Sequence, residues 1–371
     1  MHDDSRMAEL WPTMQRGLAF IRKKRQESRE LGPDYPGYDL FPPAMGDGGL
    51  NAVEPEYTSV LWTLHGIRQA YLAGKRLNLP GYEAFGEEYD DLMRAFRKAA
   101  ARDKRITDDG IEYIPMSMLT KEEYDEYICT HYDAPYVYNQ NGYLPQTGTW
   151  ALAQAITPGE VFAPDDPIVT NFLRLLDSVD DREGIPDGTG WMTGDALWGY
   201  NAMFDGQAWL YAGRGDKAVD YLYDFANHAS GGRVWREEQS IKESCSSEMC
   251  GDMPHNWGSA EFIRLTRNLI LFEKLDGLDL LAGLPDEWLP TAENDLFIEK
   301  SPTRYGLTSV HLSYVSDGVY RISYTREATL DPIDIRLHWN GEVELDVAVQ
   351  NHSDEWLIYG ACTCFNGILR K

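Results

Sequence analysis

The chain has 371 residues, of which 34 are Lys or Arg and 60 are Asp or Glu, so its formal net charge is −26. A chain this acidic should repel the phosphates of nucleic acids, which argues against general nucleic-acid binding. Hydrophobic residues make up 43% of the chain, enough for a large core. No apolar stretch is long enough to cross a bilayer, so no membrane-spanning segment is expected.

The N-terminus is polar and lacks the apolar segment of a secretory signal, which predicts a cytoplasmic protein. The five cysteines form an odd, sparse set, which argues against a disulfide framework. His131, His228 and His255 are scattered, and no pair of them has ligand spacing, so we expect neither a metal nor another cofactor. The sequence does not indicate an oligomeric state.

Apolar residues recur at helical spacing up to about residue 275. Leu10, Met14, Leu18 and Ile21 mark the first helix, and a basic run follows it at residues 22–25. Further helices are predicted at residues 57–77, 82–101, 149–155, 168–176, 196–212, 217–228 and 257–275.

A weak internal repeat favours an array of helical hairpins. Residues 70–75 (Ala-Tyr-Leu-Ala-Gly-Lys) and 209–214 (Trp-Leu-Tyr-Ala-Gly-Arg) each end a predicted helix just before a second one begins. In both, a glycine follows the last apolar turn, as is common where helices stop.

The pattern changes after Pro285. Residues 307–315 and 319–324 alternate apolar and polar side chains on either side of Asp317-Gly318, which predicts a β-hairpin. The alternation continues at 333–339 and 343–349. We therefore predict a mostly α-helical domain over residues 1–285 and a small antiparallel β domain over residues 296–371.

Three loops combine acidic and aromatic or glycine residues. Asp47 lies in a glycine-rich loop, where its carboxylate could bind hydroxyls or simply stabilise its own turn. Asp195 lies between Trp191 and Trp198, and it could serve a site or cap the following helix. Tryptophan faces can stack on sugar rings while carboxylates accept hydrogen bonds from sugar hydroxyls, so we favour a role for residues 191–200 in a site.

The third loop runs from Val234 to Glu261 and is the most informative. Its adjacent residues Glu237 and Glu238 would point to opposite sides of an extended segment, so at most one of them should be catalytic. Crowded carboxylates raise one another's proton affinity, which suits acid–base chemistry near neutral pH. The alternative is a solvated acidic loop.

Glu238-Gln239, followed by Met253-Pro254-His255-Asn256-Trp257-Gly258-Ser259-Ala260-Glu261, resembles the six-hairpin glycosidases, which include glucoamylase-like and α-L-rhamnosidase-like enzymes. The resemblance covers most of residues 40–275, but only residues 235–265 are specific. It implies an (α/α)6 toroid that hydrolyses glycosidic bonds, commonly with inversion. The sequence shows fewer helices than six hairpins require, so either helices between residues 113 and 143 escape the pattern or the toroid is incomplete.

The resemblance also implies site roles. Glu238 corresponds to the general base. The resemblance does not identify the general acid, because no Trp-Glu-Glu motif occurs upstream, and we take Asp195 as the first candidate and Asp47 as the second. In an inverting enzyme, the two carboxyl groups lie about 6.5–9.5 Å apart to leave room for water. The residues predicted to bind the carbohydrate substrate are Trp191, Trp198, Trp235, Arg236, His255 and Trp257.

Two alternatives remain open at the level of sequence. The first is a polysaccharide lyase on a similar toroid, in which Tyr132, Tyr136 or His131 would abstract a proton. The second is a non-catalytic carbohydrate-binding protein, which an incomplete toroid would favour. No Gly-x-Ser-x-Gly motif and no phosphate-binding glycine loop supports a serine hydrolase or a nucleotide-binding protein.

Overall fold

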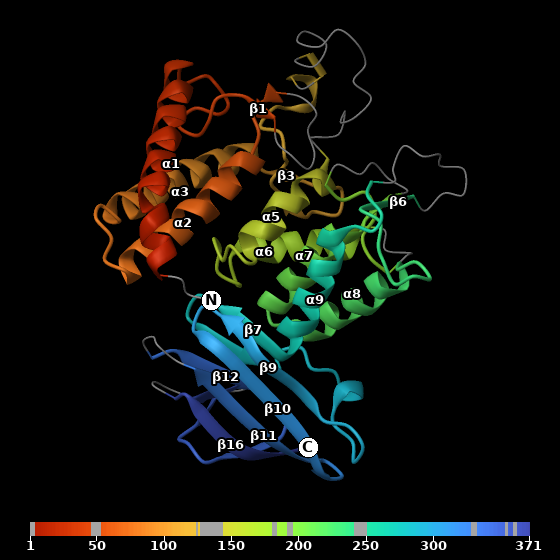
Figure 1. The fold of residues 1–371 in the computed structure, drawn as a ribbon. Coiled ribbons are helices and arrows are strands. Elements are labelled where there is room, and N and C mark those ends of the chain that lie inside the picture. The colour runs from red at the N-terminus through yellow and green to blue at the C-terminus, as the bar shows by residue number, and fades with distance from the viewer. Residues whose placement is uncertain are drawn as a thin grey trace. The chain divides into compact units, whose positions relative to one another are not determined.

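A computed structural model describes residues 4–45, 53–123, 125–126, 144–179, 184–190, 196–240, 251–327, 332–352, 355–358 and 362–371 (Figure 1). The chain divides into two compact units. The helical unit comprises Asp3–Ala208 and His228–Gly258, and the β-rich unit comprises Trp209–Asn227 and Ser259–Lys371. A helical region followed by antiparallel sheets confirms the coarse fold class predicted from the sequence.

The helical unit forms from the predicted amphipathic segments. In α2, the buried residues Val60, Leu64 and Ile67 lie three or four positions apart, which places them on one face of the helix. Helix α2 packs against α3 and α5. The helices that lie wholly in this unit are α1 (Asp4–Glu30), α2 (Thr58–Arg76), α3 (Glu83–Asp103), α5 (Thr149–Ile156) and α6 (Pro167–Ser178).

Short antiparallel strand pairs connect these helices. β1 (Ala44–Met45) pairs with β2 (Val53–Glu54), and β3 (Arg105–Ile106) pairs with β4 (Glu112–Tyr113). β5 (Ala196–Trp198) pairs with β6 (Glu238–Ser240), which brings together two segments about 40 residues apart. A short 3-10 helix, η1 (Pro145–Gly148), leads directly into α5.

Trp11 fixes α1 to its neighbours. Its ring lies 5.0 Å from that of Phe85 on α3, and its Nε1 donates a hydrogen bond to the carbonyl of Pro80 at 3.0 Å. A Cβ at Gly74 of α2 would lie 2.5 Å from the Trp11 ring, so only glycine allows this approach. The contact orders the N-terminal helix on the helical unit.

A buried ion network fastens the middle of α1. The Arg25 side chain is almost fully buried, and its Nη1 lies 2.5 Å from Oε1 of Glu88 and 2.9 Å from Oδ2 of Asp91. Its Nη2 lies 3.2 Å from Oδ1 of Asp39. Because Glu88 is also buried, the two charges depend on each other for solvation.

We expect Arg25→Ala to lower the free energy of unfolding by roughly 3 kcal/mol, because it leaves the buried Glu88 carboxylate with only the half-exposed Arg22 as its ion-pair partner. Urea denaturation followed by circular dichroism measures this loss. Arg16→Ala, at an exposed position of the same helix, serves as the control and should change stability by less than about 0.5 kcal/mol. Equal losses in the two variants would contradict the role of the network.

The β-rich unit contains two five-stranded sheets. One has the order β13-β16-β11-β10-β9, and the other has the order β14-β15-β12-β8-β7, in which only β8 and β12 pair in parallel. The strands are β7 (Leu271–Lys274), β8 (Gly277–Leu280), β9 (Leu296–Thr303), β10 (Gly306–Ser316), β11 (Val319–Glu327), β12 (Asp334–His338), β13 (Glu342–Leu345), β14 (Gln350–His352), β15 (Glu355–Ile358) and β16 (Cys364–Arg370).

One apolar core joins the two sheets. Leu278 and Ile335 from one sheet lie in the same buried cluster as Val310, Ile322 and Phe365 from the other, so the sheets face each other across this core. The unit also includes α8 (Gly215–Asn227) and most of α9 (Asn256–Ile270). Among the described residues, no helix combines the length and apolar character needed to cross a membrane.

The predicted hairpin around Asp317-Gly318 is confirmed, since β10 and β11 pair antiparallel there. Two element boundaries were wrong. The predicted helix 257–275 ends at Ile270, because residues 271–274 pair with β8 as strand β7. The predicted helix 196–212 begins as strand β5, and α7 covers only Gly199–Tyr211. A short apolar run is compatible with both the helical and the strand period, so only the presence of a pairing strand shows that the run is extended.

Candidate active site

Five aromatic rings meet within the helical unit, and Trp150 of α5 lies among them. Its ring centroid is 4.8 Å from that of Trp62 on α2, 5.0 Å from that of Trp198 on β5 and 6.4 Å from that of Trp257. Trp198 also contacts Tyr200 of α7 at 4.9 Å. We call these five residues the ring cluster. Tilted and edge-on contacts at these distances are favourable arrangements for aromatic pairs.

The outer side of the ring cluster is a stacked pair. Tyr200 and Trp257 lie 4.7 Å apart with an interplanar angle of 20°. Tyr200 is buried, whereas Trp257 keeps 40% of its surface exposed. A rigid, partly exposed indole backed by a second ring provides the kind of flat apolar face on which a sugar ring can stack.

His255 supports this platform just before the start of α9. Its Nδ1 accepts a hydrogen bond from the backbone N–H of Gly258 at 3.2 Å, so the imidazole caps the helix that carries Trp257. Its ring lies 4.9 Å from that of Tyr200, and its backbone N–H donates to the carbonyl of Trp235 at 2.9 Å. The ring and the backbone of His255 therefore both help to fix the position of the Tyr200–Trp257 pair.

Glu238 lies directly opposite Trp198 in the β5–β6 ladder. Side chains of directly opposed residues project from the same face of an antiparallel pair with Cβ atoms about 4.5–5.5 Å apart. Glu238 is half-buried and Trp198 is buried, so the Glu238 side chain starts from the same face of the ladder as Trp198 of the ring cluster. The ladder therefore brings a carboxylate and an aromatic surface together from distant parts of the sequence.

The remaining predicted substrate-binding residues have mixed positions. Trp235 is buried, while Arg236 is exposed. The backbone N–H of Glu237 donates to the carbonyl of Asp252 at 3.0 Å, so the segment containing Trp235 and Arg236 runs beside residues 252–255. Asp47, Asp195 and Trp191 lie outside the described residues, as do Tyr132, Tyr136 and His131 of the lyase alternative.

Gly190 allows Trp198 to occupy its place. A Cβ at Gly190 would lie 2.1 Å from the Trp198 ring, and the φ angle of Gly190 is +60°, a conformation that favours glycine. Its N–H donates to the carbonyl of Gln146 at 3.0 Å, which fixes the backbone at that point. Only a residue without a side chain fits there.

We expect Gly190→Ala to displace the Trp198 ring and to lower the free energy of unfolding by about 2 kcal/mol, since the new methyl group has no space. Near-ultraviolet circular dichroism of the tryptophans and chemical denaturation measure the two effects. Gly231→Ala is a suitable control, because no other atom lies within 4 Å of the place that its methyl group would take. An unchanged tryptophan spectrum in Gly190→Ala would contradict the close contact.

Two carboxyl groups without any exposed surface, those of Glu54 and Asp205, received no role from the sequence. Glu54 of β2 is fully buried; Ser117 Oγ donates to its Oε2 at 3.3 Å, and its Oε1 has no hydrogen-bond partner among the described residues. Burial raises the pKa of Glu54 to about 8, and the nearby Glu56 carboxyl acts in the same direction. Glu54 therefore holds a proton at neutral pH.

Asp205 is the second of these groups. It is fully buried on α7, and burial raises its pKa well above the usual range. Asn201, one turn earlier, donates to its Oδ2 at 3.4 Å. A signal existed in the sequence, because Asp205 is the only charged residue of Gly199–Tyr211. Within the described ranges, no three potential ligands gather into a metal site.

No protein-family model and no curated protein matches the chain. Among solved structures, it is similar to a metal-independent α-mannosidase of Streptococcus pneumoniae in a non-productive complex with α-1,6-mannobiose (12% identity, TM-score 0.37, 57% of this chain and 46% of that one). It is also similar to a glycosidase point variant (13%, 0.41, 61% and 55%) and a GH127 β-arabinofuranosidase (9%, 0.33, 84% and 59%). The chain thus spans about half the length of these structures, and TM-scores below 0.5 assign no family.

Proposed function

We propose that the chain is a glycoside hydrolase that cleaves a glycosidic bond of an oligo- or polysaccharide, with inversion at the anomeric carbon. The observation that carries the proposal is the ring cluster with Glu238 beside it. An exposed indole stacked on a buried ring offers a sugar-binding face, and a half-buried carboxylate lies next to the same cluster. Neither feature requires a cofactor.

In this proposal, a sugar ring stacks on Trp257, and the carboxylate of Glu238 takes a proton from the attacking water. The water oxygen forms a bond to the anomeric carbon as the bond to the leaving oxygen breaks. A protonated carboxyl group donates its proton to that leaving oxygen, and Asp195 remains the first candidate and Asp47 the second. Arg236, on the same segment as Glu238, is proposed to bind polar groups of the substrate.

We further propose that α2 with α3 and α5 with α6 are helical hairpins of an (α/α)6-type toroid. The pairs follow one another along the chain and are joined by connections of varied length. The division into domains at residues 1–285 and 296–371 also remains a proposal. Limited proteolysis with mass spectrometry would test this division. If it is right, the first cleavage after residue 250 should fall between residues 285 and 296.

The function is tested by incubating the full chain with a panel of oligosaccharides and aryl glycosides. We expect release of reducing sugar, and proton NMR during the first minutes should show the anomer opposite to that of the substrate. Unsaturated products absorbing in the near ultraviolet would instead support a lyase. Binding across the panel without any turnover would contradict the hydrolase and support a carbohydrate-binding protein.

A further inference from the structure

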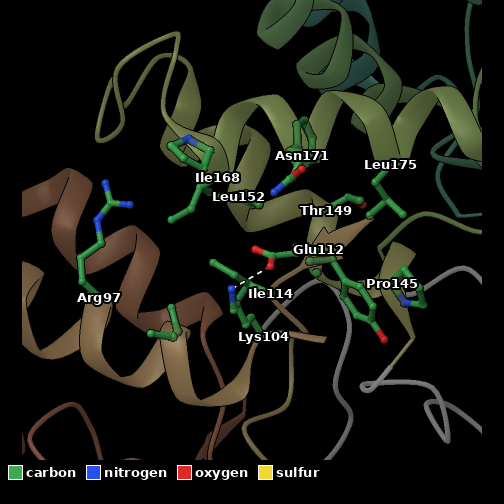
Figure 2. Close-up of a pocket in the computed structure, with 16 residues that line it drawn as sticks. Arg97, Lys104, Glu112, Ile114, Pro145, Thr149, Leu152, Ile168, Asn171 and Leu175 are labelled. Carbon is green, nitrogen blue, oxygen red and sulfur yellow. Dashed lines mark hydrogen bonds and ion pairs between the residues drawn. The ribbon is translucent and has the colours of Figure 1, made fainter. Parts of the chain in front are cut away.

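A cavity of about 220 Å³ lies in the helical unit. It is lined by residues of α3, β4, η1, α5 and α6 and open on one side, and its lining includes neither a residue of the ring cluster nor any described residue predicted for the active site. Figure 2 shows Leu152 and Ile168 above Lys104 and Glu112, which a dashed line joins. The cavity is therefore a separate feature of the fold.

The walls of the cavity are mostly apolar. Leu152 of α5 and three apolar residues of α6, Ile168, Phe172 and Leu175, line it together with Ala100 of α3. A sugar, which carries hydroxyl groups around its ring, would leave most of them without partners against such walls. This lining suits an apolar body and is unlike a carbohydrate subsite.

The size of the cavity limits the occupant. Engineered apolar cavities of about 150 Å³ hold benzene, whereas sites for drug-sized ligands occupy about 300–1,000 Å³. A volume of about 220 Å³ lies between these values. The body should therefore be one aromatic ring or a short alkyl chain.

The lining also includes the ion pair of Lys104 and Glu112, with Nζ 2.7 Å from Oε1 and with 47% and 42% of the side-chain surfaces exposed (Figure 2). An ammonium has three N–H donors, and Glu112 accepts one of them. Arg97, also in the lining, adds a second cation at the edge of the cavity, although Asp166 already pairs with it. A ligand with a carboxylate could bond to the remaining donors of Lys104 and compete with Glu112 for this cation.

We propose that this cavity is a binding site for a small amphipathic monocarboxylate with an aromatic or short alkyl body. The apolar body lies against Leu152, Ile168 and Phe172, and the carboxylate accepts hydrogen bonds from Lys104. This site goes beyond the proposed hydrolase function and does not depend on it, because neither Glu238 nor Trp257 takes part.

The probe for the test is 3-phenylpropionate, and the uncharged control is 3-phenyl-1-propanol. Binding to the full chain is measured by isothermal titration calorimetry, with the methyl NMR shifts of Ile114 and Ile168 locating the ligand. The carboxylate should bind roughly tenfold more tightly than the alcohol, as a charge-assisted hydrogen bond would produce. Equal affinity of the two compounds, or shifts only at other methyl groups, would overturn the proposal.

Two charge variants should change the affinity for the carboxylate in opposite directions, which a non-specific apolar site would not do. Lys104→Ala should weaken binding of the carboxylate roughly tenfold and leave binding of the alcohol unchanged. Glu112→Gln should strengthen binding of the carboxylate, because the side chain that competes for Lys104 is no longer charged. Both residues are exposed at their outer ends, so the variants should fold. A Glu112→Gln variant that binds the carboxylate more weakly would count against the proposed geometry.

Two filling variants test the location. Ile168→Trp should abolish binding of both compounds, because the indole would occupy the cavity. Ala101→Leu, at an exposed position of α3 that lines the cavity, should weaken binding at least fivefold and is compatible with the helix. Unchanged affinity in folded Ala101→Leu and Ile168→Trp would place the ligand elsewhere and overturn the proposal.

Discussion

Glu238→Gln should lower kcat/KM for glycoside hydrolysis about 10³-fold, which is within the range expected for loss of a positioned general base. The amide has nearly the same shape as the carboxylate and can keep the place opposite Trp198, but it cannot take a proton from water. Initial rates on the substrate found in the panel measure the effect. The KM should change little, because the aromatic binding surface is intact.

Glu237→Gln is the matched control. Glu237 directly precedes strand β6, and its Cβ lies against Gly251 rather than in the β5–β6 ladder. The rate of this variant should stay within about twofold of the wild type, since Glu237 is not assigned the proton transfer. Comparable losses in the two variants, or none in Glu238→Gln, would remove Glu238 as the base.

The second large effect concerns Glu54 and pH. Its pKa is about 8 in the folded protein and 4.5 in an exposed environment, so between these values the folded state holds a proton that the unfolded state has lost. The stability that this proton supplies is complete below pH 4.5 and disappears as the pH rises toward 8. Its contribution should fall by ~1.4 kcal/mol per pH unit, or roughly 5 kcal/mol in all.

Glu54→Gln should remove this part of the pH dependence, because glutamine keeps a polar group beside Ser117 but does not ionise. Urea denaturation at pH 5 to 8 measures the slope in both proteins. Glu83→Gln, at an exposed position, is the control and should keep the wild-type slope. A Glu54→Gln slope equal to that of the wild type would contradict the buried, protonated state.

The helices could be predicted because their signal is local. Each of α2, α3 and α6 buries residues three or four positions apart, and that spacing is visible without any partner. The strand β7 could not be predicted, because Leu271 and Phe272 extend the apolar pattern of the preceding helix. Only pairing with β8 shows that the chain becomes extended there.

The candidate site was predicted in part. The sequence singled out Glu238, Trp198 and Trp257 from their composition and from a resemblance, and the structure brings all three to the ring cluster or beside it. No role was assigned from the sequence to Trp62 of α2 or to Trp150 of the nearly fully buried α5. Their contacts arise from the packing of α2 against α5, and a one-dimensional pattern does not report this packing.

The sequence by itself determined that most of the helices form, that a hairpin forms around Asp317-Gly318 and which loops carry acidic and aromatic residues. These features depend on periodicity, turn chemistry and composition, all of which are properties of neighbouring residues. Tertiary structure alone decided that Glu238 lies opposite Trp198 and that Glu54 holds a proton. Strand register and burial depend on residues far apart in the chain, and burial sets the cost of ionising a carboxyl group.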